Sequence, residues 1–169
     1  MKIRIAVPAD AQGIAEVHVA SWRSTYRGIV SDAYLAQLNT ESKKEFWESQ
    51  LNLPEAKEFI FVAEHETDGI VGFISGGKTR EPELVYGAEI YAVYILQSMQ
   101  QQGIGTGLFQ ALSRAFKRNG YTSMMLWVIE GNPSTAFYKK MGGQEVVKRG
   151  IKVGHDELSE IALGWKHTE

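Results

Sequence analysis

The amino-acid sequence predicts an α+β fold in which helices flank a mixed central β-sheet. Strand-like and helix-like segments alternate through most of the chain. Near its middle the order is strand, glycine-rich turn, helix, strand, which requires a right-handed crossover between two parallel strands. A short turn separates two other neighbouring strands, as expected for an antiparallel hairpin. With 169 residues, the chain is expected to be one domain, 1–169, with a substantial core.

The first half of the chain shows a strand, three helical stretches and a hairpin. Ile3, Ile5 and Val7 recur at every second position, which is the period of a half-buried strand. Ile14 and Val17 recur at helical spacing. The predicted elements are strand 2–7, helices 8–20, 31–38 and 41–51, and strands 59–64 and 70–75 joined by a turn at 67–69.

The second half contains the stronger helix signals. Asn132 followed by Pro133 is a good helix start, because asparagine caps the first turn and proline suits the first helical position. Gly120 and Gly142 are each placed to end a helix. The predicted elements are strand 85–96, helix 103–119, strand 123–129, a helix beginning at Asn132, and two strands within 144–165 that turn at 153–156.

Composition narrows the possible functions. Hydrophobic residues make up 44% and charged residues 22% of the chain, as in an ordinary soluble globular protein. The net charge of −2 and the lack of a basic stripe argue against nucleic acid as a partner. The absence of cysteine excludes disulfides, thiolate metal sites and a cysteine nucleophile, and fits a cytoplasmic location. No membrane association is expected, because no apolar stretch could span a bilayer and the start lacks a signal peptide's apolar block.

Two further kinds of site find no support in the sequence. A serine hydrolase would need a G-x-S-x-G elbow, which is missing. The histidines lie in separate segments without ligand spacing, so no metal site is predicted. They are His18, His65, His155 and His167.

The most informative stretch is the glycine-rich turn 100–107, Gln-Gln-Gln-Gly-Ile-Gly-Thr-Gly. It follows the apolar run 90–96 and precedes a helical pattern. Such a turn leaves several backbone N–H groups unpaired, at the positive end of the helix dipole. Its glycines let the backbone approach a ligand and adopt positive φ. The stretch therefore predicts a pyrophosphate site.

Two common pyrophosphate motifs do not fit this turn. The dinucleotide fingerprint G-x-G-x-x-G/A would need glycine or alanine where Leu108 stands. The ATP-binding loop needs Gly-Lys followed by Ser or Thr, which the sequence lacks. What remains is Gln100-x-x-Gly103-x-Gly105. This resembles the Q/R-x-x-G-x-G/A signature of the GCN5-related N-acetyltransferases, the GNAT family, which cradles the pyrophosphate of acetyl-coenzyme A.

A second motif adds to this resemblance. Segment 132–143 contains Asn132, Ala136, Tyr138 and Gly142. It is similar to the family's N-x-x-A-x-x-x-Y-x-x-x-G-F segment, with a shorter spacing between alanine and tyrosine. The chain departs from that pattern at Gly143, where the family usually has an aromatic residue. The order of elements resembles the GNAT acyl-CoA N-acyltransferase fold along nearly the whole chain.

The resemblance implies where acetyl-CoA would bind as co-substrate. In the family, the two central parallel strands splay apart after a bulge, and the pantetheine arm enters the gap and pairs with the first strand. An open strand edge inside a protein is costly unless a ligand fills it. The implied contacts are Val93, Tyr94 and Ile95 for pantetheine, the turn residues Gln100, Gln101, Gln102, Gly103, Ile104, Gly105 and Thr106 for pyrophosphate, and Asn132 and Tyr138.

Acetyl transfer to an amine also requires proton chemistry. The resemblance assigns Tyr138 to protonate the departing thiolate, and the alternative is that Tyr138 is core packing. Asn132 could equally be a plain helix cap. Glu89 is the only acidic residue in strand 85–96, and desolvation there would raise its pKa toward a useful value for a general base. The alternatives are that Glu89 is an exposed strand-end residue and that a water chain removes the proton.

The acceptor is expected beside segment 21–30, an aromatic and turn-like stretch between two helices. Trp22 and Tyr26 could wall the acceptor pocket, or could anchor the loop to the core. The resulting prediction is an acetyl-CoA-dependent N-acetyltransferase acting on a primary amine of a small molecule. Two alternatives stay open: a protein N-terminus or lysine as acceptor, and an acyl-CoA-binding sensor without turnover. A homodimer is also expected, because the apolar run 161–165 reads as a strand edge better covered than exposed.

Overall fold

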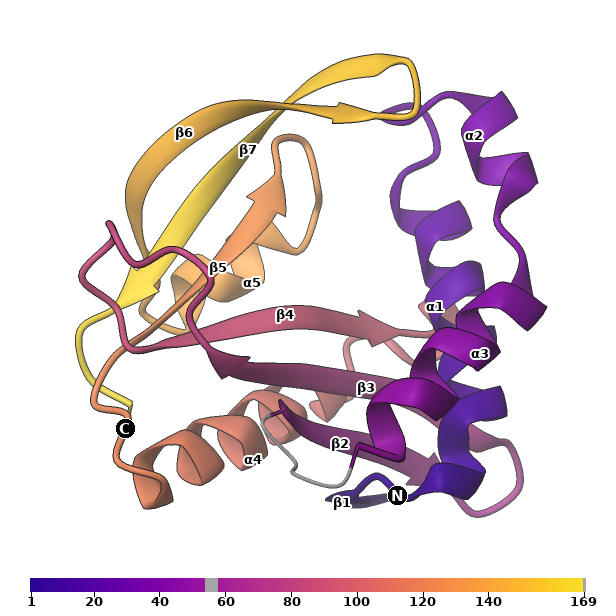
Figure 1. Ribbon diagram of the computed structural model, residues 1–169. Coiled ribbons are helices and arrows are strands. Elements are labelled where there is room, and N and C mark those ends of the chain that lie inside the picture. The colour runs from indigo at the N-terminus through magenta and orange to yellow at the C-terminus, as the bar shows by residue number, and fades with distance from the viewer. Residues whose placement is uncertain (54–57, 169) are drawn as a thin grey trace.

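The computed structural model describes residues 1–53 and 58–168, which form a seven-stranded mixed sheet flanked by helices (Figure 1). The strand order is β1-β2-β3-β4-β5-β7-β6. Among the described strands, only β4 and β5 pair in parallel. The strands are β1 (Lys2–Ile5), β2 (Glu58–His65), β3 (Gly69–Lys78), β4 (Ala88–Ile95), β5 (Met124–Ile129), β6 (Gln144–Val153) and β7 (Asp156–Trp165). This confirms the predicted α+β fold.

Helices cover the two faces of the sheet over separate cores. Phe73 and Ile74, which are neighbours on β3, point to opposite faces, and Phe73 packs with Trp47 whereas Ile74 packs with Phe116. Fully burying side chains of this kind contributes about 1.5–3 kcal/mol each. The helices are α1 (Ala11–Thr25), α2 (Asp32–Gln37), α3 (Thr40–Leu51), α4 (Ile104–Arg118) and α5 (Thr135–Lys140).

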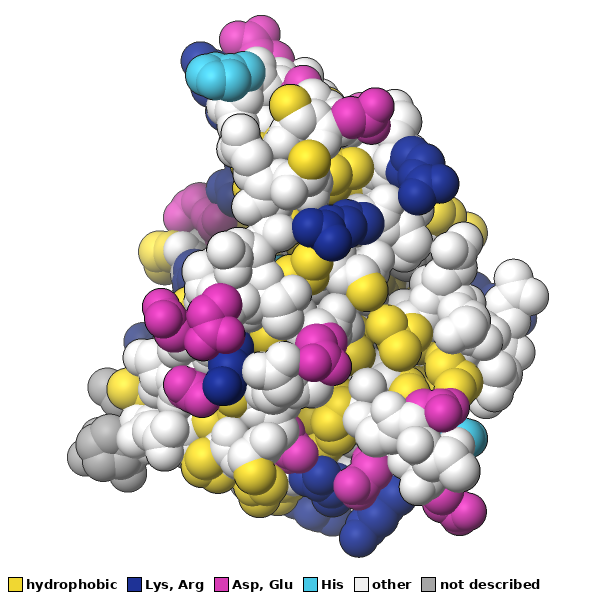
Figure 2. Space-filling view, turned by 90° about the vertical axis from the view of Figure 1, so that its right-hand side faces the viewer, with side chains coloured by type: hydrophobic (Ala, Val, Ile, Leu, Met, Phe, Trp, Pro, Cys, Tyr) yellow, Lys and Arg dark blue, Asp and Glu magenta, His cyan; other side chains and the backbone are white. Residues whose placement is uncertain are grey.

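The side of the molecule that carries α1 to α3 has no single dominant charge. Figure 2 shows acidic and basic side chains scattered over this face, with apolar side chains between them. Within the described residues, no helix is both long and apolar enough to cross a membrane.

The parallel strands β4 and β5 pair only at their beginnings, where Ala88–Ile90 lie beside Met124–Leu126. Beyond this point β4 carries one extra residue relative to β3, because Ser75 pairs with Ala92 whereas Gly76 pairs with Ile90. The resulting bulge at Tyr91 bends β4. From Tyr91 to Ile95, the edge of β4 that faces β5 has no partner strand among the described residues. The splay that the resemblance implied is therefore present.

Gly76 permits the close packing at this bulge. A Cβ at position 76 would lie 2.6 Å from the backbone oxygen of Glu89 and 2.8 Å from the ring of Phe116. Any larger residue would push β3 away from β4 or from α4, so glycine holds the start of the splay in place.

The C-terminal hairpin of β6 and β7 reaches across to the helical layer, and its tip lies beside α2 (Figure 1). The backbone N–H of Ser31 donates to the Asp156 carboxylate at 2.9 Å. Tyr26, Ile129 and Val153 share a small apolar cluster. The turn after α1, the end of β5 and the hairpin are therefore held together around the region where β4 and β5 diverge.

Three predicted boundaries are wrong. The first helix is a short 3₁₀ turn, Pro8–Asp10, followed by α1, which continues to Thr25, so Trp22 lies on a helix and not in a turn. The fourth strand begins at Ala88, and Val85 before it is 96% exposed. Asn132 is not the cap of α5: the helix begins at Thr135, and Asn132 Oδ1 accepts from the Ser134 N–H at 2.8 Å.

The apolar C-terminal run is also not an edge. β7 lies between β5 and β6, and Ile161, Leu163 and Trp165 are at most 7% exposed. The Trp165 indole donates to the Met141 oxygen at 2.9 Å, and a Cβ at Gly143 would lie 2.8 Å from this ring. Trp165 thus fills the space of the aromatic residue missing at position 143. The homodimer expectation loses the observation on which it depended.

Candidate active site

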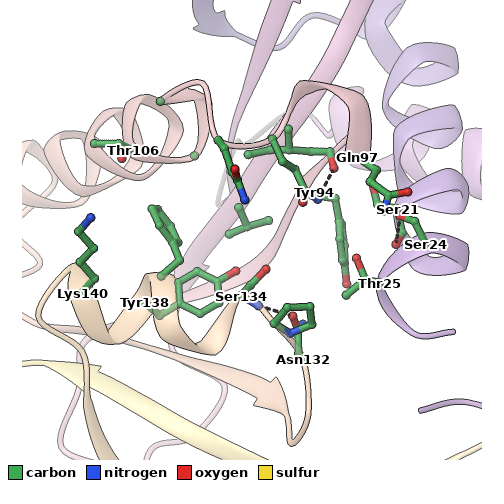
Figure 3. A pocket seen from close by; sticks show the side chains of 18 residues that line it. Ser21, Ser24, Thr25, Tyr94, Gln97, Thr106, Asn132, Ser134, Tyr138 and Lys140 are labelled. Carbon is green, nitrogen blue, oxygen red and sulfur yellow. Dashed lines mark hydrogen bonds between the residues drawn. The ribbon is translucent and has the colours of Figure 1, made fainter. Parts of the chain in front are cut away.

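A large cleft of about 570 Å³ opens beside the splay. It runs from the start of α4, past the end of β4, to the last turn of α1, and α5 forms another wall (Figure 3). Most of the predicted coenzyme contacts line it, although they come from three separate segments. They are Val93, Tyr94, Ile95, Gln100, Gln101, Gly103, Gly105, Thr106, Asn132 and Tyr138.

The N-terminus of α4 presents free backbone donors to this cleft. Gly103 is the N-cap residue with a φ of 80°, and no side chain of the described residues caps the helix. The first helical hydrogen bond runs from Gly107 N to Gly103 O, so the amides of 104–106 precede the helical ladder. Gln100 Nε2 donates to the Ile95 oxygen at 3.3 Å and ties the turn to the end of β4. This arrangement can hold an anion by its backbone.

Two residues of the predicted cradle turn their side chains elsewhere. Ile104 is buried in the core beneath α4. Gln102 is exposed, and its Nε2 donates to the Ser98 oxygen at 3.4 Å. Neither side chain lines the cleft, so any contribution from these two positions comes from the backbone.

Lys140 is the one charged side chain that lines the large cleft among the described residues. It comes from the end of α5 and lies across the cleft from the first turn of α4 (Figure 3). Its ammonium adds a positive charge to the positive end of the α4 dipole. The cleft therefore favours a ligand that carries negative charge.

A second cavity of about 40 Å³ occupies the gap between β4 and β5. Its walls are residues 90–94 of β4, residues 126–128 of β5, and Tyr26 from the end of α1. Val93, Tyr94, Asn132 and Tyr138 line both this cavity and the large cleft. Two reactants that enter from the two sides would meet at these four residues.

Tyr138 is held at this junction by α5. The side chain is 6% exposed, and burial raises its pKa, with a further contribution from nearby Tyr26. The phenol therefore stays protonated at neutral pH. Its hydroxyl makes no hydrogen bond to another described side chain, although it lines both cavities. This geometry suits a proton donor.

Trp22 and Tyr26 differ in their placement. Tyr26 lines the small cavity, whereas Trp22 lines neither cavity. The Trp22 indole donates to the Tyr94 hydroxyl at 2.9 Å, and its ring packs on Tyr26 with centroids 4.4 Å apart. Asn132 Nδ2 donates to the Tyr26 hydroxyl at 3.1 Å. Trp22 is therefore an anchor, and only Tyr26 can touch a reactant in the cavity.

Glu89 does not face either cavity. It is 1% exposed, so it is not an exposed strand-end residue. Its carboxylate accepts from Arg80 Nη2 at 2.6 Å, Nε at 3.3 Å and the backbone N–H at 2.9 Å. This arrangement argues against Glu89 as a direct base, because the carboxylate is occupied in anchoring the β3–β4 connection.

Several lining residues escaped the sequence reasoning. Ser21, Ser24 and Thr25 line the large cleft from one face of α1. Their i, i+3, i+4 spacing places them on the same side of a helix, but the predicted helix ended at residue 20 and did not include them. Tyr91 and Trp127 line the small cavity. The Trp127 Nε1 donates to Glu81 at 3.1 Å, and the Arg149 guanidinium stacks 3.7 Å above the Trp127 ring.

We predict that Glu89→Gln lowers stability without removing a base. The amide keeps the side-chain volume but loses the ionic part of the bonds to Arg80, so the free energy of unfolding should fall by about 1.5–3 kcal/mol. Urea denaturation measures this change. Both kcat and the acidic limb of the kcat/KM–pH profile should match wild type.

Arg80→Gln is the matched control for this pair. It leaves a buried carboxylate without its cation and should be at least as destabilising as the change at Glu89. The anchoring role fails if Glu89→Gln stays as stable as wild type while the acidic limb disappears, which would restore Glu89 as the base.

Comparisons with known proteins agree with this geometry. The Acetyltransferase (GNAT) family model matches residues 19–143. The chain is 36% identical over 163 residues to the uncharacterised N-acetyltransferase YuaI of Bacillus subtilis, covering 96% of this chain and 91% of YuaI.

Two solved structures share the fold. One is the PaiA N-acetyltransferase of Thermoplasma acidophilum in complex with coenzyme A, with a TM-score of 0.72, 24% identity and coverage of 95% of this chain and 98% of that one. The other is YncA of Salmonella typhimurium with its cofactor acetyl-CoA, with a TM-score of 0.71, 19% identity and coverage of 100% and 94%. The family motifs, the splayed strands and these relatives agree, and the chain belongs to the GNAT acetyltransferase family as an N-acyltransferase.

Proposed function

We propose that this protein transfers the acetyl group of acetyl-CoA to a primary amine of a small molecule. The observation that carries the proposal is the junction of the two cavities at Val93, Tyr94, Asn132 and Tyr138. The pyrophosphate would lie on the α4 N-terminus and the pantetheine arm along the open edge of β4. PaiA and YncA, which share this fold, were solved with coenzyme A and acetyl-CoA respectively, which supports a coenzyme as the ligand of the large cleft.

The reaction then follows from the geometry. The amine nitrogen attacks the thioester carbon from the small cavity, and the carbonyl π pair moves to the oxygen. When this intermediate collapses, the C–S bond breaks and the sulfur takes the proton of the Tyr138 hydroxyl. The tyrosinate regains a proton from the newly formed ammonium through water.

The acceptor must lose a proton before it attacks, because an alkyl ammonium with a pKa of about 10.4 has no lone pair. No aspartate, glutamate or histidine is among the described residues that line either cavity. We therefore assign proton removal to water in the gap between β4 and β5.

The approach to the small cavity favours a small acceptor. The β6–β7 tip is fastened to the segment after α1 through Ser31 and Asp156, and Gly154 lies against the ring of Tyr34. We expect these contacts to limit the space beside Tyr26 through which an amine would approach. A protein terminus or lysine would need an open groove at the same place.

An acceptor screen tests the proposal. Release of free coenzyme A thiol from acetyl-CoA is measured with small primary amines, peptides with free N-termini and lysine peptides. Turnover with one group of small amines and not with the peptides is expected. Turnover confined to the peptides would overturn the small-molecule assignment, and binding of acetyl-CoA without turnover on any amine would favour the sensor alternative.

We predict that Lys140→Glu weakens acetyl-CoA binding by about 10-fold or more, because it replaces the one cation of the cleft with an anion facing the coenzyme phosphates. Isothermal titration calorimetry measures the change. Lys139→Glu is the matched control: it alters the net charge equally, but Lys139 lies outside the cleft and pairs with Glu145 at 3.4 Å. Equal losses in the two variants would show that only overall charge matters.

A further inference from the structure

Aromatic side chains dominate the lining of the small cavity between β4 and β5. Five of its eleven lining residues are tyrosine or tryptophan, and none of the described residues that line it is charged. Its volume of about 40 Å³ admits the head of a small ligand, whereas the coenzyme needs the large cleft. The aromatic lining residues are Tyr26, Tyr91, Tyr94, Trp127 and Tyr138.

Trp127 separates this cavity from a charged cluster. The cavity lies on the β4 side of β5, whereas Arg149 comes from β6, which lies beyond β7 on the other side of β5. The Arg149 guanidinium carbon lies 3.7 Å from the centre of the Trp127 ring. The guanidinium thus approaches the ring from the side of β6 and leaves the β4 side of the ring to the cavity.

The cluster behind Trp127 carries a surplus negative charge. Arg149 donates to Glu81 at 2.8 Å and to Glu160 at 2.7 Å, so one cation is held by two carboxylates and the sum is −1. Glu81 also accepts from Trp127 Nε1 at 3.1 Å. A carboxylate on the indole N–H pushes electron density into the ring, which makes the ring face a better partner for a cation.

Tyr91, across the gap on β4, has a neutral ion pair beside it. The Arg80 guanidinium carbon lies 4.4 Å from the centre of the Tyr91 ring, and Glu89 balances its charge at 2.6 Å. This pair adds no net charge, so the surplus carboxylate beside Trp127 sets the sign on this side of the gap.

The two cavities therefore favour ligand groups of opposite charge. Ring faces are partly negative, and tryptophan binds a cation more strongly than tyrosine or phenylalanine does. The large cleft instead has Lys140 and the positive end of the α4 dipole. An anionic coenzyme and a cationic acceptor would each be attracted to one cavity and repelled from the other.

We infer that Trp127 is a specificity residue of the acceptor site, and that its ring holds the acceptor as a protonated primary ammonium. The inference rests on the proposed function and deepens it, because it names the charge state in which the acceptor is recognised. The bound ammonium gives one proton to water in the gap, and the lone pair left on nitrogen then bonds to the thioester carbon. A neutral alcohol of the same shape gains no such attraction.

The test measures binding to the coenzyme A complex, in which no acetyl group can transfer. Propylammonium and 1-propanol are matched charged and neutral probes. The readout is the indole N–H resonance of Trp127, one of four such signals, which is identified by its loss from the spectrum of Trp127→Phe. Propylammonium should shift this resonance saturably, whereas 1-propanol at the same concentration should not. Equal shifts with both probes, or none with propylammonium, would overturn the inference.

Variants at position 127 separate the electrostatic role from packing. Trp127→Leu should weaken propylammonium binding about 2–30-fold, the range of one cation–π contact, and Trp127→Phe should weaken it less. Saturation-transfer NMR on the probe measures these affinities, and the calorimetric Kd for acetyl-CoA should stay within about twofold of wild type if the fold is kept.

Fluorination of the ring keeps the indole in place. Incorporation of 5,7-difluorotryptophan at position 127 withdraws electron density from the ring face, so propylammonium should bind more weakly than to wild type. The same analogue at position 165 is the control, because Trp165 lines neither cavity. Wild-type affinity in the protein fluorinated at position 127 would mean that Trp127 is packing only, which contradicts the inference.

The outcomes distinguish this inference from the function on which it rests. If the acceptor screen finds turnover but binding does not depend on probe charge, the inference fails alone. If propylammonium binds at Trp127 while no amine is acetylated, the proposed function fails and the cation site is kept. If the protein does not bind coenzyme A, both fail.

Discussion

Replacing Tyr138 with phenylalanine is expected to lower kcat by about 10²–10⁴-fold, which is the usual cost of losing a general acid. The change removes one oxygen that lies at the junction of both cavities and keeps the buried ring. Because this hydroxyl bonds to no other described side chain, the free energy of unfolding should stay within about 0.5 kcal/mol of wild type. Steady-state kinetics with the best acceptor and urea denaturation provide the two measurements.

The pH dependence gives this prediction a second readout. An acid acts in its protonated form, and burial raises the pKa of Tyr138 above the ordinary tyrosine value of about 10. Wild-type kcat should therefore show no alkaline loss attributable to Tyr138 below about pH 10. Tyr121→Phe is the matched control, since Tyr121 packs on Phe116 away from both cavities. If the variant at position 138 keeps kcat within a few-fold of wild type, Tyr138 is packing and the thiolate is protonated from elsewhere.

Replacing Gly103 with valine is expected to weaken acetyl-CoA binding by about 100-fold or more. Gly103 has a φ of 80° and nothing within 4 Å of a Cβ built there, so the chain itself leaves room for a side chain. That room lies where a pyrophosphate would approach the α4 amides, and an isopropyl group there would keep the phosphates from their donors. Calorimetry measures the affinity, and circular dichroism checks that the fold is kept.

Gly120→Val separates obstruction from backbone strain. Gly120 follows the other end of α4, has a φ of 84° and likewise has nothing within 4 Å of a built Cβ. Both variants carry the strain of a β-branched residue at positive φ, but only position 103 lines the cleft. Comparable losses of affinity in the two variants would mean that strain, and not blocked phosphate contact, explains the result.

Much of the fold could be predicted because its signals are local. The hairpin turn at 67–69, the glycine at the start of α4 and the stop at Gly142 each act within a few residues, through φ preference and unpaired backbone groups. The predicted start of the helix at Asn132 lies three residues before the observed start of α5 at Thr135. Asn132 supplies the expected side-chain acceptor, but it closes a turn before the helix, and its amide group bonds to Tyr26 instead.

The surroundings of Glu89 and the wrong placement of the C-terminal strand have a different origin. Alternation along β4 indicates that Glu89 lies among apolar residues, but it cannot indicate that Arg80, in the connection between β3 and β4, folds back to within hydrogen-bond distance of it. In the same way, the apolar run Ile161–Trp165 can belong to an edge or an inner strand. Its place depends on β6 folding back to cover it. Both outcomes are set by pairings between segments.

The sequence by itself determined the alternation of strands and helices, the glycine-rich turn before α4, and the position of Tyr138 in the helix that follows Asn132. These features depend on neighbouring residues, through backbone conformation and helix termini. Only the tertiary structure decided which side chains share the reaction gap. The Asn132–Tyr26 bond joins residues 106 positions apart and the Trp22–Tyr94 bond joins residues 72 apart. Such contacts form only when burial of the sheet and helix faces outweighs the entropy of closing long loops, so no local pattern in the chain encodes them.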